Sequence, residues 1–101
     1  MNVPTADDDN LDCYVGPEPE SNDVYVVDQL KLDGKSWDEH KVILGCSTPE
    51  TAEEIYRAGH HASDRTFGAM TRFSMPMFRR WMATHDMTQP CDPSVEVRPW
   101  A

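Results

Sequence analysis

The chain has 101 residues, 39% of them apolar, and a formal net charge of -9. This length and composition predict one domain with a thin hydrophobic core. The excess of 18 acids over 9 bases argues against a protein that coats DNA or RNA, because such a protein needs a basic surface. The longest apolar run is too short to cross a membrane, and the acidic start does not resemble a signal peptide, so we expect a cytoplasmic protein.

Three strands are predicted in the first half of the chain. Apolar and polar residues alternate over residues 11–15, which predicts a half-buried strand. Residues 24–32 are β-branched and aromatic and predict the best strand of the chain. The dipeptide Asp33-Gly34 then separates this strand from residues 35–44, which is a strong hairpin signal.

Two helices and a fourth strand are predicted in the second half. Hydroxyl residues followed by a proline predict a helix over residues 49–58. Residues 67–73 are expected to form a strand, and Ser74 is expected to cap a second helix whose apolar stripe runs from Phe78 to His85. Prolines beyond that point predict an irregular tail.

The expected fold is therefore α+β, with the element order strand, strand, strand, helix, strand, helix. We expect a small antiparallel, partly barrel-like sheet of about four strands with two helices. Residues 1–85 would form the single domain, and residues 86–101 the proline-containing tail.

The hairpin makes a chemical prediction. If Asp33-Gly34 is a two-residue loop, Asp28 lies opposite Glu39, on the same face as Lys41. Facing carboxylates, with Cβ atoms ~5 Å apart, repel each other unless something compensates them. A divalent cation such as Mg²⁺ or Mn²⁺ is one compensator and the Lys41 ammonium is another, and the sequence leaves both open. The predicted pairs are Leu30–Trp37, Asp28–Glu39, Val26–Lys41 and Val24–Ile43.

A second acidic cluster precedes the first of these strands. Asp7, Asp9 and Asp12 converge if residues 7–10 turn and if Asp12 points away from the core that its two neighbours enter. Three convergent carboxylates form a site for a hard cation. The alternative is a solvated acidic segment.

The run from Asp7 to Cys13 resembles the acidic signature of soluble, Mg²⁺-dependent inorganic pyrophosphatases. It is similar above all to the compact pyrophosphatase-like domain of polyvalent proteins from bacteriophages and mobile elements. The resemblance implies a truncated version of their β-barrel with flanking helices. It covers residues 6–83 and includes residues 14–17, 24–29, 37–42, 49–58, 67–71 and 77–81.

The resemblance also implies roles for individual residues. Asp12 and Lys41 would be catalytic, with Lys41 binding a phosphate oxygen as a point charge. Bound metal would lower the pKa of a water molecule for attack on the phosphoanhydride. The implied Mg²⁺ or Mn²⁺ ligands are Asp7, Asp9, Asp12, Asp28 and Glu39.

This sequence departs from the family pattern in several ways. Asn10 replaces a proline of the signature, and Glu39 replaces an aspartate. The soluble enzymes also draw site residues from upstream of the signature, whereas Asp7 is only six residues from the start of this sequence. We therefore expect a minimal site.

Three functional hypotheses follow. The first is a metal-dependent hydrolase acting on a small phosphate compound, pyrophosphate or a nucleotide-like relative. The second is a non-catalytic acidic protein of a phage or mobile element that binds and inhibits a basic host protein, for example a defence complex, in the bacterial cytoplasm. The third is a structural remnant that forms a homo-oligomer or joins a larger chain. No direct nucleic-acid or membrane binding is expected. Convergent acids favour the first hypothesis, and acids dispersed over an outer face favour the second.

Overall fold

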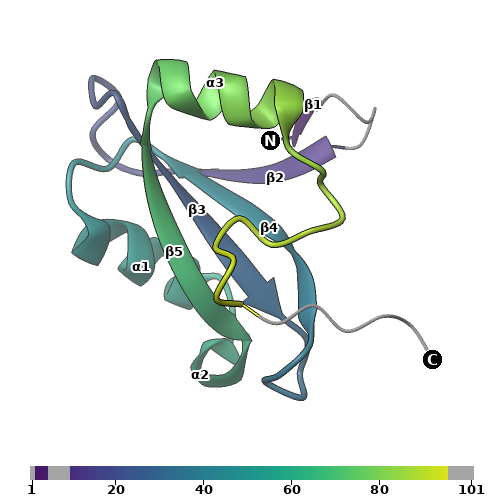
Figure 1. The fold of residues 1–101 in the computed structure, drawn as a ribbon. Helices are drawn as coiled ribbons and strands as arrows, with labels where there is room; N and C mark the ends of the chain where they lie inside the picture. The colour runs from purple at the N-terminus through teal and green to yellow at the C-terminus, as the bar shows by residue number, and fades with distance from the viewer. Residues whose placement is uncertain (1, 5–9, 96–101) are drawn as a thin grey trace.

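The structure is a computed structural model that describes residues 2–4 and 10–95. The predicted order of strands and helices is confirmed (Figure 1), with a short first strand and a short extra helix that the sequence did not predict. The α+β class is confirmed as well. The elements are β1 (Asn2–Pro4), β2 (Asn10–Val15), β3 (Asp23–Leu30), β4 (Trp37–Leu44), α1 (Pro49–Ala58), α2 (Ser63–Thr66), β5 (Phe67–Ser74) and α3 (Met75–Thr84).

The strands form one sheet in the order β1-β2-β4-β3-β5. The β3–β4 pair is antiparallel, as expected for a hairpin, and β5 pairs antiparallel with the other edge of β3. However, β2 pairs with β4 in parallel. In the sheet β4 lies between β2 and β3, so β2 and β3 do not pair although they are consecutive in the chain. The sheet is consequently mixed and open, rather than antiparallel throughout and partly closed. No helix within the described ranges is long and apolar enough to span a membrane.

Each face of the sheet carries its own hydrophobic cluster (Figure 1). The face covered by α3, called the α3 face below, packs Val24, Val26 and Val42 against Phe78. The opposite face, called the α1 face, packs residues of β3 and β4 against Tyr56 of α1. Because alternate residues of a strand point to opposite sides, the register of each strand decides which side chains reach which face.

One extra residue in β4 changes the register of the hairpin. Leu30 pairs with Trp37 as predicted, but Gln29 pairs with Glu39, so Asp38 has no partner across the ladder. Such a β-bulge reverses the alternation of side chains beyond it. The predicted pairs before Leu30 are therefore wrong by one position.

The prediction that Asp28 faces Glu39 is accordingly wrong. Asp28 pairs with His40 and lies on the α3 face. A second bulge at Gly68 of β5 lies on the other side of Asp28. A Cβ at Gly68 would lie 2.6 Å from the Asp28 carbonyl oxygen, so only glycine allows the two strands to approach this closely.

Asp28 instead anchors residues 86–95, called the C-terminal strap below. The Asp28 side chain is fully buried, and its carboxylate accepts the backbone N–H groups of Cys91 at 2.8 Å and Asp92 at 2.9 Å. Burial raises the pKa of Asp28, although these two hydrogen bonds oppose the shift. The strap forms turns without helix or strand and buries Met87. The division into a domain at residues 1–85 and a tail stays a prediction.

Replacing Asp28 is expected to weaken the strap. In Asp28→Asn one of the two backbone N–H groups faces an amide NH₂ and loses its acceptor. We expect the free energy of unfolding to fall by about 1–3 kcal/mol in urea denaturation. Asp64→Asn, at an exposed acid of α2, is the matched control. Equal stability of the two variants would contradict the anchoring role.

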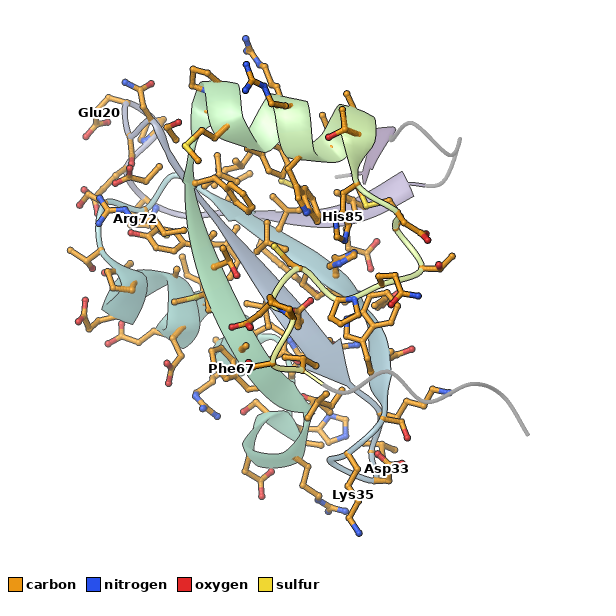
Figure 2. All side chains as sticks on the ribbon, in the orientation of Figure 1. Glu20, Asp33, Lys35, Phe67, Arg72 and His85 are labelled. Atoms are coloured by element: carbon orange, nitrogen blue, oxygen red, sulfur yellow. The ribbon has the colours of Figure 1, made fainter. Side chains whose placement is uncertain are left out.

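His40 makes stability depend on pH. Its ring is buried among Trp37, Trp81 and His85, with Nε2 3.6 Å from Asp28 Oδ1, and Figure 2 shows His85 between α3 and the sheet. Burial, reinforced by His85, lowers the pKa of His40 to about 4. The unfolded chain binds this proton near pH 6.5, so stability falls as the pH drops from there towards 4.

The His40 contribution is expected to reach about 3 kcal/mol between pH 7 and pH 4. Asp28 acts in the opposite sense, because its raised pKa lets the folded state take up a proton at a higher pH than the unfolded chain. Urea denaturation across this pH range should therefore show that the free energy of unfolding falls less steeply with acid in His40→Gln than in the parent. His61→Gln, at an exposed ring, should keep the parent slope. The same slope in all three proteins would refute the assignment.

Candidate active site

Three charged residues from two strands meet on the α1 face. Asp12 of β2 pairs with Lys41 across the parallel ladder, and Glu39 lies two residues before Lys41 on the same side of β4. The Lys41 Nζ donates to Asp12 Oδ2 and lies 2.5 Å from Glu39 Oε1. We call these residues the Asp12–Glu39–Lys41 cluster. Asp12 points here because its neighbours Leu11 and Cys13 are buried on the α3 face.

The charges in the cluster are unequally exposed. The Lys41 side chain is 7% exposed, whereas those of Asp12 and Glu39 are 51% and 50% exposed. Burial alone would lower the pKa of Lys41, but the hydrogen bonds and charges of the two carboxylates outweigh it and raise the pKa to about 12. Lys41 is therefore a fixed cation behind two carboxylates that reach solvent.

The structure brings together three of the six site residues predicted from the sequence. Asp12, Glu39 and Lys41 form the cluster, whereas Asp28 lies on the opposite face of the sheet. The remaining two predicted ligands, Asp7 and Asp9, lie outside the described residues.

Gln29 occupies the place expected for Asp28, and sequence reasoning missed it. Its Nε2 donates to Asp38 Oδ2 at 3.2 Å, and its Oε1 accepts the Tyr56 hydroxyl at 2.9 Å. The Tyr56 hydroxyl also lies 2.8 Å from Thr66 Oγ1. The position opposite Glu39 thus holds a neutral amide fixed on both sides. Only the bulge reveals this, because nothing in the sequence marks Asp38 as the extra residue.

A histidine beyond α1 extends this polar network. His60 Nδ1 lies 2.7 Å from the Tyr56 carbonyl oxygen, which can only accept, so Nδ1 carries the proton. In the neutral ring Nε2 then accepts the Tyr14 hydroxyl at 3.3 Å. The ring stacks on Tyr56 with centroids 4.1 Å apart. Tyr14 follows Asp12 by two residues in β2, so the network borders the charged cluster.

A pocket of about 270 Å³ opens beside the cluster. It lies between the end of the β3–β4 hairpin and the loop that follows α1. Its lining residues are Gln29, Leu30, Lys31, Leu32, Asp38, Gly59, His60, His61, Ala62 and Thr66.

The cluster has the right donor chemistry for a hard cation. Carboxylate oxygens are the ligands that Mg²⁺ takes, and each carboxylate contacts Lys41 through one of its two oxygens. No group of three histidine, cysteine, aspartate or glutamate side chains within the described part of the chain is arranged to hold a metal.

Comparison with known proteins identifies the family. The family model for inorganic pyrophosphatase matches residues 2–83, most of the chain. The chain therefore belongs to the inorganic pyrophosphatase family, and the resemblance seen in the sequence is confirmed. This membership indicates a small phosphate compound as substrate in a family that usually uses Mg²⁺. No curated protein and no solved structure matches the chain.

Removing the lysine should expose the repulsion between the two carboxylates. In Lys41→Met we expect the free energy of unfolding to fall by about 1–3 kcal/mol, because Asp12 and Glu39 lose a buried charge-assisted partner. Added Mg²⁺ should restore part of that stability, since a divalent cation compensates the same charges. Urea denaturation with and without MgCl₂ measures both effects.

Lys35→Met, at the exposed hairpin tip, is the matched control for Lys41→Met. It should change neither stability nor the response to Mg²⁺. A Lys41→Met protein as stable as the parent would show that the cluster is not electrostatically coupled.

Proposed function

We propose that this member of the family is a metal-dependent phosphoanhydride hydrolase that acts on pyrophosphate-type substrates. The observation that supports it is the convergence of Asp12 and Glu39, from different strands, on the buried cation Lys41. Acids that serve only to attract a basic partner need no such convergence, since dispersed surface charge has the same effect.

Lys41 is suited to bind a phosphate oxygen. An ammonium group has three N–H donors, and the contacts with Asp12 and Glu39 occupy two of them. In the proposed reaction the third donor would bind a phosphate oxygen. Because its pKa is about 12, Lys41 keeps its positive charge throughout the physiological pH range.

The carboxylates would hold the cation and orient the nucleophile. Asp12 and Glu39, together with Asp7 and Asp9, are the residues proposed to bind Mg²⁺ or Mn²⁺. When bound, the cation would neutralise phosphate charge and acidify a water molecule. Asp28 is not part of this site, because it lies on the α3 face.

The proposed reaction is an in-line displacement by water. The water oxygen forms a bond to one phosphorus, the bond from that phosphorus to the bridging oxygen breaks, and two orthophosphates and a proton are released. Asp12 and Glu39 lie where they can accept hydrogen bonds from the attacking water. Lys41 lies where it can offset the charge that develops on the phosphate oxygens.

The test is phosphate release from pyrophosphate by purified protein with Mg²⁺ or Mn²⁺. Asp12→Asn is expected to lower the turnover by about 100-fold or more while circular dichroism shows an intact fold. Glu54→Gln, at an exposed acid of α1, should retain activity.

A folded parent protein with no turnover in either metal would overturn the proposal. The acidic binding module would then be the hypothesis to pursue, with salt-sensitive binding to a basic protein as its readout.

A further inference from the structure

The pocket lies next to the cluster, although none of the three cluster residues lines it. Gln29 and Asp38 line it, and they lie next to Glu39 across and along the strand. The far end of the pocket approaches the hairpin tip, which packs near Arg65 of α2, and Figure 2 shows Asp33 and Lys35 at this tip. A ligand that contacts Glu39 at one end and lies along Asp38 and Gln29 would extend from the cluster towards the pocket.

The lining of the pocket does not suit a second phosphate group. Lys31 and Asp38 contribute one charge of each sign, and the carboxylate of Glu39 lies nearby. Without a cation such as the one proposed at the cluster, a multiply charged anion gains no net attraction in such surroundings. Leu30 and Leu32 provide apolar walls. The lining thus matches an uncharged group with apolar faces.

The polar groups of the pocket favour an uncharged ligand group that has N–H donors at its edge. Asp38 uses Oδ2 for the Gln29 amide, so its other oxygen can accept an N–H of a ligand. His60, one face of which stacks on Tyr56, and the exposed His61 also line the pocket, and a flat ligand would stack on these rings. A planar heterocycle with N–H groups at its edge combines these properties.

Gln29 stands between the pocket and the cluster. Because it is a neutral amide held by Tyr56 and Asp38, it does not repel a diphosphate that passes from one to the other. A carboxylate at this position, as the sequence suggested for Asp28, would repel it. The volume of about 270 Å³ lies just below the range of ~300–1,000 Å³ that is typical of ligand pockets.

We propose that the pocket binds the nucleoside end of a nucleoside diphosphate whose phosphates lie at the Asp12–Glu39–Lys41 cluster. This inference rests on the proposed function and names its substrate class. Water would attack the terminal phosphorus, the bond from that phosphorus to the bridging oxygen would break, and a nucleoside monophosphate, orthophosphate and a proton would be released.

The test compares ligands that differ only in the nucleoside. Calorimetry with Mg²⁺ measures the affinity of the α,β-methylene analogues of the four ribonucleoside diphosphates and of methylenediphosphonate, none of which can be hydrolysed at the bridge. We expect at least one nucleotide analogue to bind about tenfold more tightly than methylenediphosphonate, because it fills the pocket.

Variants of the pocket residues test whether the gain in affinity comes from the pocket. Leu32→Ala combined with His61→Ala should weaken binding of the preferred nucleotide analogue by about tenfold. Met77→Ala is the matched control, since Met77 is 61% exposed on α3 and Leu32 is 64% exposed at the pocket. Equal affinity for all five ligands, or an equal loss in the pocket and control variants, would overturn the inference.

The outcomes separate this inference from the proposed function. A protein that hydrolyses pyrophosphate but gains nothing from a nucleoside overturns the pocket assignment alone. A protein that binds nucleotide analogues through the pocket but hydrolyses neither pyrophosphate nor nucleoside diphosphates supports the pocket and overturns the hydrolase.

Discussion

The extra residue at Asp38 decides which side chains of β3 and β4 share a face. Without it, Asp28 would lie opposite Glu39 and beside Lys41. With it, Gln29 takes that position, and Asp28 turns into the α3 face next to His40. The matching bulge at Gly68 extends the same offset to β5, where only glycine tolerates the close approach. This offset therefore decides which carboxylates lie on the α3 face and which lie on the α1 face.

The two faces use carboxylates in different ways. On the α3 face, Asp28 is buried and satisfied by backbone N–H groups of the C-terminal strap, so its role is structural. On the α1 face, Asp12 and Glu39 are half exposed and share one buried lysine. A carboxylate that reaches solvent can exchange a partner for a cation, whereas a buried one cannot without exposing the donors it satisfies.

Much of the fold follows from local signals. Alternation, β-branched residues, helix caps and Asp33-Gly34 predicted the four main strands and two long helices, because these depend on neighbours within a few residues. The pair Leu30–Trp37 was also predicted, since the turn fixes it. The parallel β2–β4 pair was not, because strand order depends on contacts between distant segments.

For the site, the sequence by itself determined that Asp12 points away from the core and that Glu39 and Lys41 share a face, since both follow from a two-residue period. The acidic signature also indicated a resemblance to inorganic pyrophosphatases, which the family model over residues 2–83 confirms. Tertiary structure alone decided that Gln29 faces Glu39, that Asp28 anchors the strap, and that a pocket opens beside the cluster. A bulge is set by packing against both neighbouring strands, and no local sequence pattern records that packing.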